Sequence, residues 1–462
     1  MTLPALPRLA ALIDALGAGL LEREAAVRLA LLAALAGEHV LLIGPPGTAK
    51  SELARRLHRA FTGAPYFERL LTRFSTPEEL FGPLSLKALE EDRYERLTAG
   101  FLPTAGVAFL DEVFKANSAI LNALLTLLNE RVFDNGSGRT AVPLVSVVGA
   151  TNELPSDDAL SAFFDRFLLR VPVAPVSDAA FERLLRLDAA RTEPAEPLDP
   201  AARAAVTARA AVTQLGEDAL AACQALRRFM AAQGRTLSDR RWRQWIGLMR
   251  VAAATEGRPA VDALDLWLAP YVAAAAPEQM PALAEWVDAE IAHAQPREAP
   301  WLTRAVEAFE LQLQVELSAP DSSDAGADAG KLALARAIGG NESGESGMLR
   351  IVSAALEEQQ RRRFSPVHVA ARLAQLDEVI AHAQGQRDTV AAQAGALADA
   401  LRGRLWLPPT LGARWQAAHA HTLAVLDALL QRARAARAGF AALPLDAGMP
   451  ALAPEALAWA PG

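Results

Sequence analysis

The most constraining stretch of the sequence is a short apolar run that leads directly into a loop rich in glycine and proline. The run HVLLI (39–43) is continuously apolar, which predicts a strand buried on both of its faces. The loop GPPGTAKS (44–51) follows it, and a helical pattern over 51–61 follows the loop. A phosphate-binding loop requires this order of strand, loop and helix.

The loop is expected to bind ATP or ADP. Backbone amides of the loop and of the helix start face the β-phosphate, Lys50 reaches the β- and γ-phosphates, and the Ser51 hydroxyl is a ligand for Mg²⁺. Ala49 replaces the glycine that usually precedes the lysine, and we expect a negative φ at this position. The predicted nucleotide-binding residues are Gly44, Pro45, Pro46, Gly47, Thr48, Ala49, Lys50 and Ser51.

Composition supports the importance of that lysine. Only four lysines occur, and arginine supplies the rest of the 46 basic residues; the lysines are Lys50, Lys87, Lys115 and Lys331. A single cysteine, Cys223, excludes a disulfide scaffold and a cysteine-rich zinc site. The net charge of −8 argues against a strongly basic nucleic-acid surface.

Strand patterns alternate with helical patterns over the first part of the chain, which predicts an α/β domain with a parallel sheet. A helix over 5–36 precedes the first strand. Later helices are expected at 51–61, 118–132 and 157–164. The expected strands are 39–43, 66–72, 107–111, 144–150 and 167–173.

Three domains follow from this order: an α/β core over 1–175, an all-α lid over 176–295, and a helical C-terminal extension over 296–462. Two insertions interrupt the core, at about 73–103 and about 132–143. The sequence LSLKALEEDRYERLTAG (84–100) alternates like a hairpin, and Asn-Gly in FDNGSGRTAVP (133–143) predicts a second one. A flexible loop is expected at about 318–330, and GRLWLPP (403–409) is the only strand-like stretch after 300.

Two strands end in polar residues suited to hydrolysis. VAFLDE (107–112) places Asp111 to hold Mg²⁺ and Glu112 to orient and deprotonate an attacking water. Asn152, after the strand at 144–150, is placed to polarise the same water. Glu22-Arg23-Glu24 has two readings, a position near the adenine or a solvated helix end, and the solvated helix end is preferred.

Three arginines are candidates for stabilising charge in the transition state. Arg166 in FFDRF follows a short helix and is expected to reach a neighbouring subunit's site. In SDRRW (238–242), Arg240 or Arg241 is expected to reach back from the lid to the γ-phosphate, with Arg240 preferred.

The N-terminus is a poor signal peptide, and no stretch of about 18 uninterrupted apolar residues predicts a membrane span. We therefore expect a cytoplasmic protein.

Together these segments resemble AAA+ ATPases of the MoxR family, and most closely its RavA branch. The resemblance covers about 15–260 and rests on GPPGTAKS, TRFSTPEELFGPLS, RYERLTAG, FLDEVFKANSAILNALLTLLNER, GATNELP, FFDRF and SDRRW. It makes Lys50 and Ser51 the Walker A pair, and Asp111 and Glu112 the Walker B pair. It also makes Asn152 sensor 1, Arg166 the arginine finger and Arg240 sensor 2.

The resemblance further implies a hexameric ring that acts like a chaperone on protein clients, together with a von Willebrand factor A domain partner. A nucleic-acid-stimulated motor is the alternative, and the acidic net charge favours the protein-remodelling function. A nucleotide-gated scaffold with negligible turnover is a third alternative, against which the adjacent pair Asp111 and Glu112 argues.

Overall fold

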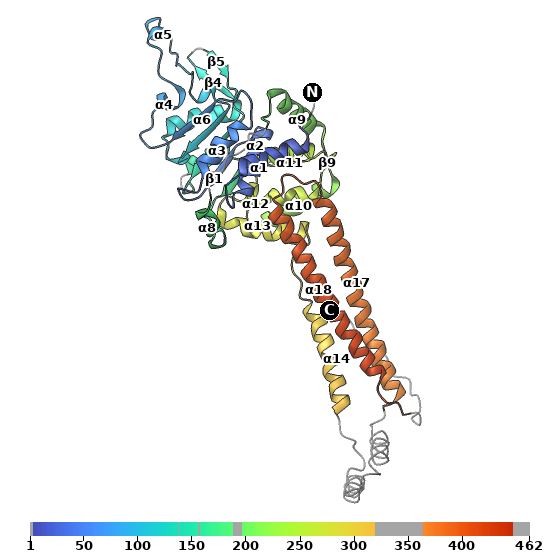
Figure 1. Cartoon of the computed structure of the whole chain (residues 1–462). Coiled ribbons are helices and arrows are strands. Elements are labelled where there is room, and N and C mark those ends of the chain that lie inside the picture. The colour runs from blue at the N-terminus through green and yellow to red at the C-terminus, as the bar shows by residue number, and fades with distance from the viewer. Residues whose placement is uncertain (1–2, 137, 156–157, 188–195, 319–363, 447–462) are drawn as a thin grey trace, which may run out of the picture. The chain divides into compact units, whose positions relative to one another are not determined.

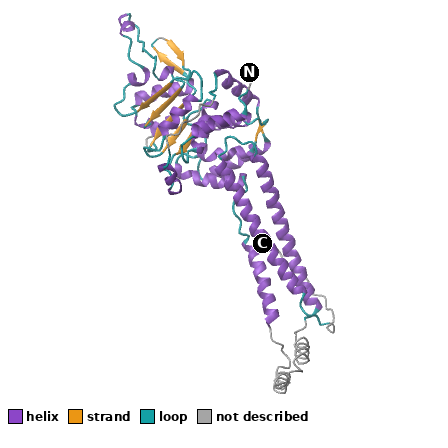
Figure 2. Cartoon of the chain, viewed as in Figure 1, coloured by secondary structure: helices purple, strands orange, loops and turns teal. Residues whose placement is uncertain are grey.

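The computed structural model describes residues 3–136, 138–155, 158–187, 196–318 and 364–446. They form two compact units, one from 1–294 with 397–415, and one from 295–396 with 416–462. Every strand among the described residues lies in the first unit (Figures 1 and 2). Apart from Ser318, the flexible loop expected at about 318–330 lies outside the described residues.

A five-stranded parallel sheet forms the centre of the first unit, as the alternating pattern predicts. The strand β1 (Val40–Ile43) is buried at all four positions and pairs with a strand on each side. The order across the sheet is β2 (Tyr66–Leu70), β3 (Val107–Asp111), β6 (Ser146–Thr151), β1 and β7 (Leu169–Pro172). Because the strands are parallel, their carboxyl ends all lie at one edge of the sheet, next to the loop that follows β1.

Helices pack against this sheet, among them α2 (Glu24–Ala36), α3 (Lys50–Arg59), α6 (Ser118–Glu130) and α7 (Asp158–Phe164). Apolar side chains of the strands and of α6 share one buried cluster. The single helix expected over 5–36 is wrong, because α1 (Leu6–Gly17) and α2 are separate. Positive φ angles at Gly19 and Glu22 break the helical path between them.

The first insertion contains two short helices, and the second of them lies within 84–100, where a hairpin was expected. It contains α4 (Pro77–Phe81) and α5 (Leu86–Glu90), and a single bridge between Leu84 and Arg96 is its only sheet-like pairing among the described residues. The second insertion is the predicted hairpin of β4 (Val132–Asn135) and β5 (Gly138–Ala141). The two insertions meet where the Asn135 side chain bonds the backbone N–H and carbonyl of Arg96.

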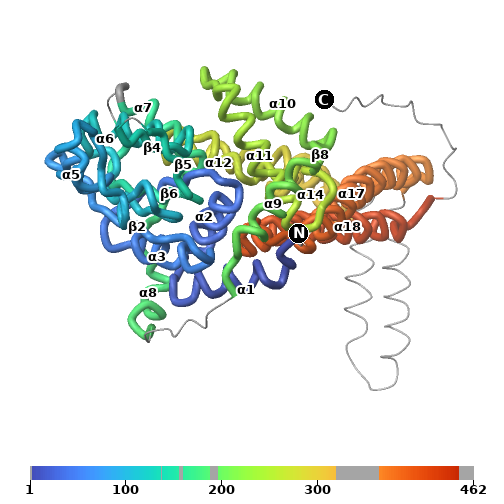
Figure 3. Tube along the Cα trace, turned by 90° about the horizontal axis from the view of Figure 1, so that it is seen from above, coloured from blue at the N-terminus to red at the C-terminus, as the bar shows by residue number. Residues whose placement is uncertain are grey.

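Residues after β7 form the helical part of the first unit, in which α9 and α11 lie side by side (Figure 3). Its elements are α8 (Asp178–Leu185), α9 (Pro200–Val212), β8 (Gln214–Leu215), α10 (Glu217–Ala232), α11 (Asp239–Thr255), β9 (Ala260–Val261), α12 (Ala269–Ala273) and α13 (Met280–Trp286). The sequence predicts an all-α lid over 176–295, and we call this helical region the lid.

Residues 397–415 belong to the first unit, although the sequence places them in the extension. GRLWLPP forms no strand. Instead, Trp406 is buried and its indole donates to Thr255 Oγ1 at 2.8 Å, while Arg404 pairs with Asp265 at 2.8 Å. Both partners lie in the lid, so this segment is part of the lid's packing.

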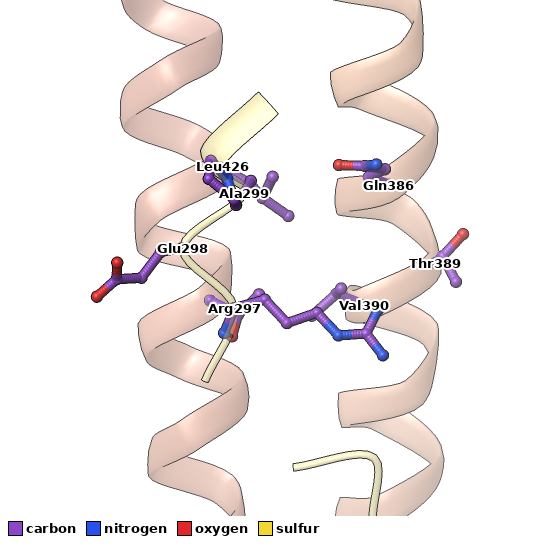
Figure 4. Close-up of a pocket in the computed structure, with 9 residues that line it drawn as sticks. Arg297, Glu298, Ala299, Gln386, Thr389, Val390 and Leu426 are labelled. Carbon is purple, nitrogen blue, oxygen red and sulfur yellow. Dashed lines mark hydrogen bonds between the residues drawn. The ribbon is translucent and has the colours of Figure 1, made fainter. Parts of the chain in front are cut away.

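The second unit consists of helices among its described residues. Its helices are α14 (Pro300–Ser318) and most of α17 (Pro366–Leu401) and α18 (Pro409–Ala441), which share a buried apolar cluster. A pocket of about 390 Å³ lies among them, and Arg297 extends across it toward Val390 (Figure 4). None of the helices in the described part of the chain is both long and apolar enough to cross a bilayer.

Candidate nucleotide-hydrolysis site

The loop between β1 and α3 is tightly constrained. A Cβ at Gly44 would lie 2.1 Å from the carbonyl oxygen of Val173, so only glycine fits there. Gly47 has a φ of 78° and Ala49 a φ of 65°, both in the left-handed region. The expected negative φ at Ala49 is therefore wrong: helical geometry begins at Lys50, and the residue before it makes the left-handed turn.

Lys50 lies folded across the loop that it follows. Its ammonium donates to the carbonyl oxygens of Gly44 at 2.5 Å and Pro45 at 2.8 Å, and to Asn152 Oδ1 at 3.4 Å. Burial lowers the pKa of Lys50, and the carboxylates of Asp111 and Glu112 oppose that shift. The cation thus lies between the loop and the polar ends of β3 and β6.

Those polar ends carry the predicted hydrolytic residues. Asp111 ends β3, and Glu112 directly follows it with a φ of 51°. Asn152 follows β6, and its amide nitrogen donates to Glu112 Oε1 at 2.7 Å. The structure therefore brings Lys50, Asp111, Glu112 and Asn152 to the carboxyl edge of one sheet.

The donor chemistry at this edge fits a magnesium ion. Ser51 offers a hydroxyl in the first turn of α3, and Asp111 offers a carboxylate at the end of β3, which packs against α3. Mg²⁺ in phosphate sites is bound through one or two protein oxygens, with water and phosphate as its other ligands. Within the described ranges no group of three or more His, Cys, Asp or Glu residues is placed to hold a metal ion by itself.

Arg23 is a site residue that sequence reasoning missed. Its side chain is buried, not solvated: Nε donates to the carbonyl oxygen of Thr48 at 3.1 Å and Nη2 to that of Ala174 at 2.6 Å. The neighbouring Glu22 accepts bonds from the Ser177 N–H and hydroxyl. Arg23 therefore joins the phosphate loop to the segment that leads into the lid. Nothing in the local pattern Glu-Arg-Glu indicates this.

The remaining three arginines lie near the opposite edge of the sheet. Arg166 precedes β7, and its Nε and Nη1 are buried without a hydrogen-bond partner among the described residues. Arg240 is exposed and donates to Asn129 Oδ1 at 2.9 Å. Arg241 donates to the carbonyl oxygens of Phe167 and Leu168, just before β7.

Neither Arg240 nor Arg241 lies near the phosphate loop of its own chain, and the expected contact of one of them with the γ-phosphate stays a prediction. The loop follows β1, whereas these arginines lie near the residues that precede β1 and β7. Four strand residues, roughly 13 Å, separate the two edges. In addition, Nε, Nη1 and Nη2 of Arg241 each donate a hydrogen bond to another residue.

Two family models match the first unit. Residues 7–210 match the MoxR domain of the MoxR-vWA-beta-propeller ternary systems, and residues 218–287 match a AAA lid domain.

Individual proteins are also similar to part of this chain. Two uncharacterized proteins of Methanocaldococcus jannaschii are each 52% identical, over 170 and 168 residues, which is 36% of this chain and 44% of each relative. Protein MoxR of Paracoccus denitrificans is 30% identical over 166 residues, 34% of this chain and 48% of that protein. A crystal structure from Cytophaga hutchinsonii aligns with a TM-score of 0.45 and 16% identity, over 60% of this chain and 85% of that one.

The matches span less than half the length of these curated relatives. The MoxR model covers the sheet, the loop and the polar strand ends described above, together with α8 and most of α9, and the lid model covers α10 to α13. The first unit of this chain thus has an AAA+ fold, with a match to a MoxR domain over 7–210 and to a AAA lid domain over 218–287.

Proposed function

We propose that the chain hydrolyses ATP at the carboxyl edge of its sheet. The observation that carries this proposal is the contact chain in which Asn152 bonds Glu112 at 2.7 Å and Lys50 at 3.4 Å. Lys50 and the loop amides hold the phosphates, and Glu112 accepts a proton from the attacking water while Asn152 orients that water. Ser51 and Asp111 would hold Mg²⁺, which supplies charge neutralisation on the phosphates when bound.

The active assembly in this proposal is a homo-oligomeric ring, with six subunits as in the resemblance. Arg166 and Arg240 lie at the edge opposite their own phosphate loop, so each is available to the nucleotide of a neighbouring subunit. An arginine supplied in this way stabilises charge on the transferred phosphoryl group. Nε and Nη1 of Arg166 have no hydrogen-bond partner in the described part of the chain, which supports its role as the arginine finger.

The work done by hydrolysis is proposed to be chaperone-like remodelling of protein complexes, as in RavA-type proteins. The matched MoxR domain is described in systems that also contain a vWA protein, which supports a von Willebrand factor A domain partner. The net charge of −8 favours a protein client over nucleic acid. ATPase stimulation by DNA or RNA would instead support the alternative motor.

Turnover and nucleotide binding test the site. Lys50→Ala is expected to abolish ATP binding, and Glu112→Gln to bind ATP, trap the assembled ring and lose turnover by at least about 10²-fold. Glu153→Gln, an exposed neighbour of Asn152, is the matched control and is expected to turn over normally. Full turnover by Glu112→Gln would contradict the proposal. The same trap, loaded with ATP, is suited to capture the client for mass spectrometry.

A further inference from the structure

Arg241 of the lid helix α11 is buried, and its guanidinium donates hydrogen bonds to both the lid and the core. Its side chain is 3% exposed. Nε donates to Val272 O at 2.8 Å, Nη1 to Asp165 Oδ1 at 3.1 Å, and Nη2 to Leu168 O at 2.7 Å and Phe167 O at 3.3 Å. A guanidinium has five N–H donors in a rigid fork, and these contacts together with a longer one to Asp165 O use all of its nitrogens.

Three of the four acceptor residues, Asp165, Phe167 and Leu168, flank Arg166 in the chain. Arg166, the proposed arginine finger, therefore lies in a segment whose backbone is hydrogen-bonded by Arg241. We call residues 164–168 the finger segment. Arg166 does not hold the segment through its own Nε or Nη1, which lack partners among the described residues. The direction of the finger thus depends on the backbone that Arg241 holds.

A second arginine fastens the same segment. Arg170 lies 3.8 Å from the centroid of the Phe164 ring, and its Nη1 donates to Ala274 O at 2.9 Å. Both arginines donate to carbonyl oxygens of the lid. Arg241 donates to Val272 O, near the end of α12, and Arg170 donates to Ala274 O, just after that helix. The finger segment is consequently attached to both α11 and α12 of the lid.

Arginine is costly at such a position. Burial lowers the pKa of Arg241, and the Asp165 carboxylate opposes that shift. Removing the guanidinium would take this donor from the buried carbonyl oxygens of Val272, Phe167 and Leu168, which is unfavourable. Lysine has no planar fork and cannot satisfy all of these acceptors together.

We propose that Arg241 is a positioning residue for the arginine finger, so that the lid of one subunit sets the finger offered to the next subunit. This inference rests on the proposed function, in which Arg166 acts in trans. It predicts that a change at Arg241 damages the neighbour's site and spares the site of the subunit that carries it.

Mixed rings of the full chain separate these two effects. Acceptor subunits carry Arg166→Ala and keep an intact site; donor subunits carry Lys50→Ala and keep an intact finger. Neither turns over ATP alone, and mixing them is expected to restore turnover. Arg241→Lys in the donor subunits is expected to lower the restored ATP turnover at least about tenfold. The same change in the acceptor subunits is expected to leave the restored turnover unchanged.

Arg235→Lys in the donor is the matched control, because Arg235 also bonds the end of α12, at Ala273 O, and has no contact with the finger segment. Restored turnover with the Arg241→Lys donor, or an equal loss from donor and acceptor, would overturn the inference. Failure of the parent mixture to turn over would instead overturn the trans finger, and the inference with it. If Arg241→Lys does not fold by circular dichroism, Asp165→Asn takes its place with the same expected outcomes.

Discussion

At the residue scale, Ala49 shows strain inside the phosphate loop. A left-handed φ of 65° costs a non-glycine residue roughly 1 kcal/mol, because its Cβ crowds the backbone. Ala49→Gly is therefore expected to raise the thermal unfolding midpoint of the first unit by about 2 °C, with ATP turnover retained. Calorimetry and a steady-state assay measure the two quantities.

The control for this prediction is Ala54→Gly, in the interior of α3, where glycine lacks that advantage and destabilises by about 1 kcal/mol or more. A lower midpoint for Ala49→Gly would show that the left-handed geometry is not a source of strain.

Arg23 gives a second prediction at this scale. Without its guanidinium the carbonyls of Thr48 and Ala174 lose their donor, and the phosphate loop loses its brace. Arg23→Ala is expected to weaken ATP affinity by about tenfold, roughly 1.4 kcal/mol, with a smaller effect on kcat. Fluorescent-nucleotide titration measures this change. Arg55→Ala removes only a surface pair with Glu68 and is expected to bind ATP normally; equal losses in both variants would refute the brace.

The position of the candidate hydrolytic residues at one edge could be predicted from the sequence, because each lies at or follows the end of a strand. Once the sheet is parallel, Lys50, Asp111, Glu112 and Asn152 must lie near one edge. Arg23 and Arg241 could not be assigned, since their acceptors Ala174 and Phe167 lie 151 and 74 residues away. Local patterns carry no information about such contacts.

At the scale of elements, the entry to β1 is linked to α11 through Glu38. Gln244 of α11 donates to Glu38 Oε2 at 2.8 Å. Burial raises the pKa of Glu38 to about 7, against the opposing influence of Arg131. Between the unfolded pKa of 4.5 and this value, the folded state retains a proton that the unfolded chain has released.

The contribution of Glu38 to the free energy of unfolding is therefore largest below pH 4.5. This contribution falls as the pH rises to about 7 and is constant above that pH. Glu38→Gln has no charge to bury and is expected to be about 1–2 kcal/mol more stable than the parent at pH 8, with no gain near pH 4.5. Urea denaturation at both values checks this. Glu90→Gln, at an exposed position, should show no such difference, and a gain independent of pH would contradict the assignment.

Other elements show where local patterns fail. The alternation in 84–100 predicts strands, yet the structure forms α5 there, because alternation over a short charged stretch does not determine which face is buried. The apolar stretch 403–409 resembles a strand, but its side chains are apolar because they pack on the lid. By contrast, Asn-Gly predicts the β4–β5 hairpin correctly, since the turn itself needs the positive φ found at Gly136.

At the scale of the whole molecule, the module places the two parts of its chemistry at opposite edges of one sheet. The phosphate loop, Glu112 and Asn152 lie at the carboxyl edge, while Arg166 and Arg240 lie near the amino edge. A single subunit so arranged is proposed to bind ATP without an arginine of its own at the γ-phosphate. In this account, a neighbouring copy completes the site, which couples hydrolysis to ring assembly.

The most direct test of this account is the turnover of Arg166→Ala, compared with its ATP affinity. The account predicts parental affinity in a nucleotide titration and a fall in kcat of about 10³-fold or more, because the arginine acts only on the transition state. Arg183→Ala, an exposed arginine of α8, serves as the control and should match the parent in both measurements. Parental kcat in Arg166→Ala would contradict the account.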